Sequence, residues 1–177
     1  MLLRRALDAL YLASGALAAT ALFGIFAVMI AQVGLRLFSI QFPGATDLTG
    51  YLCVAAAFLG LAWTFRRGEL IRVGLLIERV PARVRRWMEL AVLTLAAVLV
   101  AYILRWTFED MMFSLEINEV AQGTVPWPLW VPKLPLVIGV AILLVAVLDE
   151  WVRVLRGSQP SYAAAAEARR ARQDFKE

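Results

Sequence analysis

Four long apolar stretches, separated by short polar or charged segments, dominate the sequence. The first is an uncharged run over 9–35, which is 27 residues long, whereas a helix needs about 20 residues to cross the hydrocarbon core of a bilayer. Three further stretches cover about 48–65, 87–108 and 131–151. Because backbone groups inside a bilayer must be hydrogen-bonded within the chain, the pattern predicts an all-α integral membrane protein with four transmembrane helices.

Charged and tryptophan side chains gather at the ends of these stretches. The third stretch has Glu89 near its start and Arg105 near its end, so we expect their charged groups to reach toward water at opposite membrane faces. The fourth stretch has Lys133 at one end and Asp149 and Glu150 at the other. All six tryptophans fall at or beside a predicted end, as expected for the aromatic belts of a membrane protein.

Composition supports a membrane location, and the distribution of charge sets the orientation. The chain is 62% hydrophobic with a mean hydropathy of +0.73. Of its 18 basic residues, two precede the first stretch, seven lie in 66–86 and six follow the fourth stretch. The opposite side has Arg36 and Lys133, with Arg105 inside the third stretch near that face. The positive-inside rule therefore places both termini in the cytoplasm, and the basic charge gives no reason to expect a nucleic-acid partner.

The chain divides into a four-helix transmembrane domain, 1–156, and a cytoplasmic tail, 157–177. The tail begins with GSQPS and ends with AAAAEARRARQDFKE, which favours a helix but has little apolar surface to bury. We expect a frayed tail, with a partner-binding helix as the alternative. Near the N-terminus, the sequence ALA at 16–18 resembles a signal-peptide cleavage site. Cleavage would leave the apolar segment 19–35 outside the membrane, so an uncleaved first helix fits better.

The segment between the second and third helices is strongly basic. Positions 66–86 read RRGELIRVGLLIERVPARVRR, with seven arginines and no lysine. Read as a helix, the segment has a largely charged stripe at spacings of three and four, and much of the remaining surface is apolar. The stripe consists of Glu69, Arg72, Leu76, Arg79, Arg83 and Arg86. This predicts an amphipathic helix lying on the cytoplasmic membrane surface and interrupted at Pro81, and the alternative is a loop that only fixes the topology.

No residue pattern points to catalysis or to a cofactor or metal site. The chain has no histidine, which removes the commonest general base and haem ligand. Cys53 is the only cysteine, and we expect it to pack as a small apolar residue. No ionisable residue lies deep in a stretch, and no internal repeat or pair of broken helices marks a transport path. We therefore expect a chain that is not an enzyme and whose work is to pack against another subunit.

Pairs of small residues four positions apart indicate where membrane helices can approach closely. They are Gly15 and Ala19, Ala27 and Ala31, and Ala56 and Gly60. Gly60 is thus a candidate for shaping the bundle or a subunit interface, and the spacing leaves open whether its neighbour is internal or a partner.

Several short motifs follow one another in a recognisable order within 4–155. They are Asp47 at the start of the second helix, FLGLA at 58–62, RRGELIRV at 66–73 with Pro81 downstream, and WPLWVPKLPLVIG at 127–139. Together with four spans and cytoplasmic ends, this order resembles the small membrane subunit of tripartite ATP-independent periplasmic (TRAP) transporters, the DctQ-like family. The sequence departs from the family at Leu70, where a histidine is common, so any role tied to that histidine is absent or replaced.

The resemblance implies a multi-pass protein of the bacterial inner membrane that works with two partners. One is a large multi-helix permease subunit that carries the substrate and sodium, and the other is a periplasmic substrate-binding protein. The small subunit would act as a scaffold for the static part of the permease while a transport domain moves. Sodium coupling and uptake of organic acids would then belong to the partners, and this chain would need no cofactor.

The resemblance also assigns roles to individual residues. Asp47, Arg67, Gly68 and Pro128 would shape the bundle or its docking faces. The residues that would hold the cytoplasmic interface and lipid headgroups are Arg72, Arg79, Arg83, Arg85 and Arg86.

Two other classes of function compete with the scaffold. A homo-oligomeric four-helix transporter or channel would need polar residues at the membrane midplane, of which the sequence offers almost none. A membrane enzyme or redox subunit is disfavoured by the missing histidines and by the lack of paired carboxylates inside a span. Nothing in the sequence distinguishes a dicarboxylate from a sugar acid or another organic anion as the substrate.

Overall fold

The computed structural model describes residues 2–67, 82–123 and 125–157, and for Leu2, Leu3, Ala82 and Arg83 it describes the backbone alone. Four helices occupy this part of the chain: α1 (Leu2–Leu37), α2 (Ala45–Arg66), α4 (Ala82–Glu116) and α5 (Trp130–Leu155). Each is long and apolar enough to cross a membrane. The predicted all-α, four-span fold class is confirmed. The basic segment's central part and the tail beyond Gly157 lie outside the described residues.

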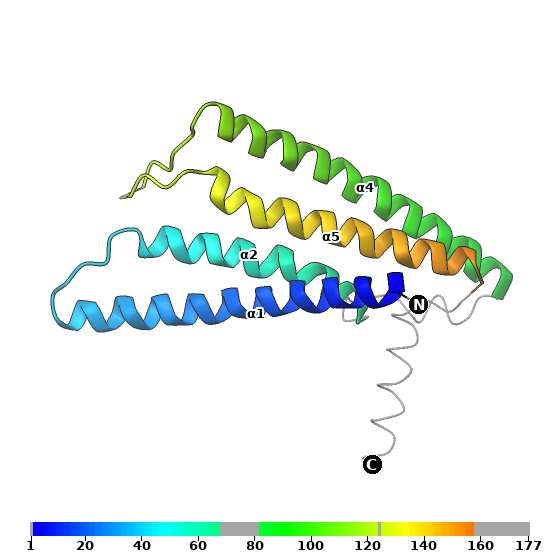
Figure 1. Cartoon of the computed structure of the whole chain (residues 1–177), viewed down its shortest axis with the longest axis horizontal. Helices are drawn as coiled ribbons and strands as arrows, with labels where there is room; N and C mark the ends of the chain where they lie inside the picture. Colours follow the sequence, from blue (N-terminus) through cyan, green and yellow to red (C-terminus); the bar gives the residue numbers. More distant parts are fainter. Residues whose placement is uncertain (1, 68–81, 124, 158–177) are drawn as a thin grey trace, which may run out of the picture.

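The helices lie side by side in the order α1, α2, α5, α4 (Figure 1). Helix α1 packs on α2, α2 on α5 and α5 on α4, while α1 and α5 touch only slightly. We call one end of this layer the terminal end, where α1 and α4 begin and α2 and α5 end. The other is the loop end, with the connections 38–44 and 117–129. The inner pair, α2 and α5, has neighbours on both sides, whereas α1 and α4 form uncovered edges.

The two edge helices are longer than the predicted spans. At a rise of 1.5 Å per residue, the 36 residues of α1 and the 35 residues of α4 extend about 54 and 52 Å, against a hydrocarbon core of about 30 Å. Helix α4 continues to Glu116, so Asp110 and Glu116 belong to the helix and not to the predicted loop. The extension has a physical support, since Lys133 Nζ of α5 lies 2.8 Å from the Asp110 carboxylate.

Direct backbone contact joins the two inner helices. A Cβ atom added at Gly139 of α5 would overlap the carbonyl group of Phe58 and would lie 2.9 Å from the amide nitrogen of Leu59. Only glycine fits where helix backbones meet this closely, which is how membrane helices gain contact area without large side chains. Gly139 does not belong to a small-residue pair, because Pro135 and Leu143 lie four positions from it.

A second close seam joins α1 to α2. The Ser14 hydroxyl of α1 donates a hydrogen bond to the Leu59 carbonyl oxygen, and both groups are buried. A Cβ atom at Gly15 would lie 3.1 Å from the Trp63 ring, and one at Gly60 would lie 3.7 Å from the Cβ of Ala18. Two of the predicted small-residue pairs therefore have a glycine that faces an internal neighbour.

We expect Gly139→Ala to lower the free energy of unfolding by about 1–3 kcal/mol, because the added methyl group overlaps a backbone that cannot swing aside. Thermal melting of the purified chain in mild detergent, followed by fluorescence-detected size exclusion, measures the effect.

Gly50→Ala in α2 is the matched control, since a Cβ atom there meets no heavy atom within 4 Å. Alanine is favoured over glycine in a helix by about 1 kcal/mol, so Gly50→Ala should leave the melting temperature unchanged or raise it. Equal melting temperatures for the two variants would contradict the close seam.

Candidate functional site: polar ends and uncovered edges of the helix layer

Polar side chains gather at the two ends of the layer, and its middle is apolar. Among the described residues, no group of three or more His, Cys, Asp or Glu side chains is placed to hold a metal ion. Cys53 is exposed on α2. Function must therefore be sought in the polar ends and in the uncovered edges.

At the terminal end, ionic and aromatic contacts tie α1 to α2. The guanidinium group of Arg66 pairs with the carboxylate of Asp8. The Arg66 guanidinium carbon also lies 4.7 Å from the centroid of the Tyr11 ring, and Tyr11 itself is buried. A cation held over an aromatic face gains more where water is excluded. These contacts link the start of the first helix to the end of the second.

Glu150 of α5 is completely buried, although the sequence places it beside the end of a predicted span. The Arg153 guanidinium lies 4.0 Å from the Glu150 carboxylate and 3.2 Å from that of Asp149. Burying a carboxylate is costly unless a cation accompanies it. The spacing of three residues between Glu150 and Arg153 places both on one helix face, and it is the sequence signal for this ion pair.

The predicted interface arginines that the structure describes make contacts within the chain. Arg67 is the residue that caps the end of α2, and its backbone N–H donates to the Trp63 carbonyl. Its guanidinium carbon lies 4.2 Å from the Trp63 ring centroid. Arg86 donates to the Leu155 carbonyl at 2.7 Å and so joins α4 to the last turn of α5. Arg85 pairs with Glu89 on α4 at 3.1 Å. The roles of Arg85 and Arg86 toward lipid and of Arg67 in shaping the bundle stay predictions.

The remaining candidates of the basic segment fall where no side chain is described. Gly68, Arg72 and Arg79 lie outside the described residues, and only the backbone of Arg83 is described.

At the loop end, the two connections pack against each other around Asp47 and Gly44. Gly44 precedes α2 with a φ of 76°, and a Cβ atom there would lie 3.0 Å from Val125 and 3.3 Å from Trp127 Nε1. The Asp47 carboxylate occupies the space that a Cβ atom at Gly123 would need. Asp47, a predicted bundle-shaping residue, therefore lies at a contact between connections far apart in the sequence.

Pro128 belongs to a short turn that leads into α5. It forms an isolated antiparallel bridge with Val120, and the Leu129 N–H donates to the Glu119 carbonyl at 2.9 Å. Lys133 lies 3.3 Å from the Glu119 carboxylate and thus fastens this turn to the first turn of α5.

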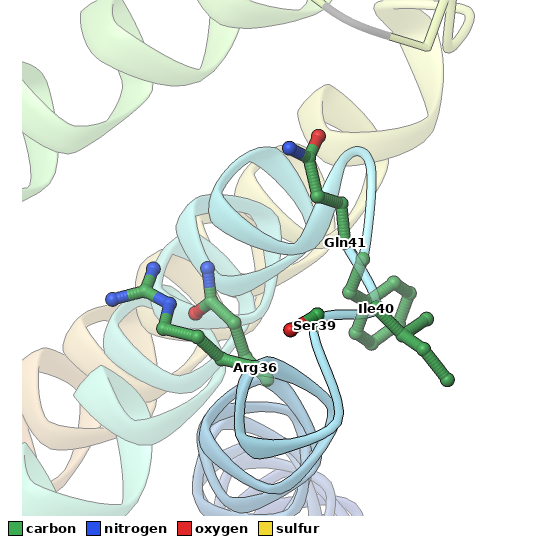
Figure 2. Close-up of a pocket in the computed structure, with 6 residues that line it drawn as sticks. Arg36, Ser39, Ile40 and Gln41 are labelled. Carbon is green, nitrogen blue, oxygen red and sulfur yellow. The ribbon is translucent and has the colours of Figure 1, made fainter.

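A polar hollow of about 490 Å³ opens where α1 ends (Figure 2). It is lined by Gln32, Arg36, Ser39, Ile40, Gln41 and Phe42. Ser39 has a φ of 59°, and the N–H groups of Ser39 and Ile40 donate back to the carbonyls of Arg36 and Leu35. This is the helix-ending motif that normally uses glycine at the left-handed position. A side chain there costs about 1–2 kcal/mol.

The edge helices expose most of their large apolar side chains. On α1 the exposed fraction is 60% for Phe26 and 62% for Val33, and on α4 it is 62% for Val98 and 61% for Tyr102. Among the described side chains of α4, only Leu93 and Ser114 are buried. Apolar surface of this extent has to be covered by lipid or by another protein.

The chain matches a family model described as tripartite ATP-independent periplasmic transporters, DctQ component, over residues 25–157. The match covers more than half of the chain and includes α2, α4 and α5 and the described loop-end residues. No curated protein matches the chain.

Gly44→Ala should destabilise the chain more than Gly157→Ala does. Both glycines have a φ of 76°, but a Cβ atom at Gly157 meets nothing within 4 Å. Each variant adds the strain of a left-handed alanine, about 1–2 kcal/mol, and only Gly44→Ala also crowds Val125 and Trp127. Melting temperatures of the two variants measure the difference.

A second substitution tests the cause of that difference. Val125→Ala in the Gly44→Ala background removes the atom nearest the added methyl group, so part of the lost melting temperature should return. Equal effects of the two single substitutions would show that the loop-to-loop contact adds nothing.

Proposed function

Because the chain belongs to the DctQ component family of tripartite ATP-independent periplasmic transporters, we propose that it is the small scaffold subunit of such a transporter. Its partner is a large multi-helix permease subunit, and a periplasmic substrate-binding protein delivers the substrate. The family is a transporter component and not a family of enzymes. The proposal assigns sodium coupling and the uptake of an organic acid to the partner subunits.

The observation that carries the scaffold role is the single layer with two uncovered edges. A transporter that works alone encloses its substrate between helices, whereas here α1 and α4 each pack on one neighbour only. Helices joined in a row by close backbone contacts form a stiff, broad surface that suits the support of a larger helix assembly. The apolar faces of α1 and α4 supply the area that such a contact needs.

The proposed orientation puts the terminal end in the cytoplasm of a bacterial cell and the loop end outside the inner membrane. It follows from fifteen basic residues on one side, against Arg36 and Lys133 on the other and Arg105 within the third stretch near that face. In this orientation the connections 38–44 and 117–129 face the periplasm. The arginines predicted to contact lipid headgroups, namely Arg72, Arg79, Arg83, Arg85 and Arg86, would then meet the cytoplasmic leaflet.

Photo-crosslinking in native membranes tests the scaffold role. A photoreactive phenylalanine analogue replaces exposed residues along both edges, including Phe26, which is 60% exposed, and Tyr102, which is 61% exposed. We expect crosslinks from at least one edge to a large multi-span protein. Phe65 of α2, which is 7% exposed, is the matched control and should give crosslinks within the chain only.

A pull-down with a C-terminal tag in mild detergent complements this measurement. We expect one large permease in near-equal amount. Recovery of the chain alone as a discrete homo-oligomer, together with solute uptake by that oligomer in liposomes, would replace the scaffold with a self-sufficient transporter.

A further inference from the structure

The hollow at the loop end of α1 combines a cation with several neutral hydrogen-bonding groups. Arg36 and Gln32 lie four residues apart and so share one face of the last turns of α1. Figure 2 shows the Ser39 hydroxyl turned toward the side of the hollow on which Arg36 lies, whereas the Gln41 amide points away from both. The Arg36 guanidinium, the Gln32 amide and the Ser39 hydroxyl are groups that hold a phosphate through charge-assisted hydrogen bonds.

Arg36 differs from the other basic side chains of the loop end in lacking a carboxylate partner. Arg105 pairs with Glu109 at 3.0 Å and Lys133 pairs with Asp110 at 2.8 Å. Among the residues that the structure describes, no ion pair involves Arg36. A guanidinium group with five N–H donors is therefore available at the rim of the hollow.

Ser39 is a second, independent observation at the same place. The backbone there is left-handed, with a φ of 59°, and glycine would take this conformation without strain. Serine instead adds strain and a hydroxyl group that lines the hollow. Asn118 ends α4 with the same left-handed turn, at a φ of 48°, so the hydroxyl group at the hollow, and not the strain, is what Ser39 adds to the site.

The surroundings of the hollow indicate a lipid and not a soluble anion. Helix α1 leads up to it with exposed apolar side chains, with exposed fractions of 58% at Ile30, 62% at Val33 and 81% at Leu37. A polar hollow at the end of an apolar helix surface matches a phospholipid, which has a phosphate at the membrane interface and acyl chains below it.

We propose that this hollow binds the phosphodiester group of a membrane glycerophospholipid in the leaflet at the loop end. Arg36 donates two N–H groups to the phosphate oxygens, and the Ser39 hydroxyl and the Gln32 amide donate further hydrogen bonds. The hollow contributes one cation, and Asp47 lines an adjoining hollow that shares Gln41 and Phe42. Phosphatidylethanolamine, with one phosphate and one ammonium group, is therefore the lipid chosen as the probe.

Native mass spectrometry of the full chain, titrated with phosphatidylethanolamine in detergent, measures the binding. We expect Arg36→Gln to weaken lipid retention roughly tenfold, as for a lost hydrogen-bonded charge. Arg105→Gln is the matched control, because Arg105 is an exposed loop-end arginine that already pairs with Glu109. It should leave retention unchanged.

Two substitutions at Ser39 separate binding from folding. Ser39→Gly relieves the left-handed strain, so it should raise the melting temperature while lowering lipid retention. Ser39→Ala keeps the strain and removes the hydroxyl, so it should lower retention without raising the melting temperature. A purely structural role for Ser39 would change stability and leave retention as in the unsubstituted chain.

Two results would overturn the proposal. One is equal lipid retention by the Arg36→Gln and Arg105→Gln variants. The other is displacement of the lipid by soluble glycerophosphoethanolamine at an equal concentration, which would mean that acyl chains contribute nothing and that the hollow serves a soluble phosphate compound.

Discussion

The backbone of α2 at Phe58 and Leu59 is the point at which the layer is held together, because helices from both sides meet it there. Gly139 of α5 lies against the backbone of both residues, and the Ser14 hydroxyl of α1 donates to the Leu59 carbonyl. In a bilayer, apolar side chains gain little by leaving lipid for one another, so helix association depends on close packing and on hydrogen bonds. Both kinds of contact occur at this place.

The two edge helices, α1 and α4, are held less closely than the inner pair. Helix α1 packs mainly on α2 and helix α4 on α5, on the outer sides of this pair, and each keeps most of its surface uncovered. The contacts that brace the edge helices are at the ends. At the terminal end, Arg66 and Arg86 tie α1 to α2 and α4 to α5, and at the loop end the two connections pack on each other. The row of helices thus has close contacts between neighbours and uncovered faces on α1 and α4, as the scaffold proposal requires.

The sequence was sufficient for the helices and insufficient for the contacts between them. Long apolar runs predicted four spans because a bilayer imposes a minimum length on each helix, and small-residue spacing pointed to Gly60, which faces Ala18 in the structure. The spacing of small residues does not identify Gly139, because its partner is a backbone segment of another helix. The three-residue spacing of Glu150 and Arg153 allows an ion pair, but the burial of Glu150 depends on how α5 lies against its neighbours.

The ends of the helices were harder to predict, for a related reason. The predicted third span ends at about residue 108, but α4 continues to Glu116, and Lys133 of α5 pairs with Asp110 in this extension. The hollow at Arg36 likewise depends on the left-handed turn at Ser39. Glycine is the usual residue in such a turn, so the serine did not indicate a helix end.

The length of α1 and the position of Arg36 are linked by the thickness of the membrane. The uncharged run over 9–35 has 27 residues and would extend about 40 Å as a helix, while the hydrocarbon core is about 30 Å thick. With Arg4, Arg5 and Asp8 before the run and Arg36 after it, both ends must reach polar surroundings, so the helix has to tilt in the membrane. A helix packed on one neighbour only can tilt in this way if its far end is held at the interface. A phosphate bound by Arg36 would fix the depth of this end of α1 in the membrane. Lipid binding at the hollow would therefore also set the tilt of α1.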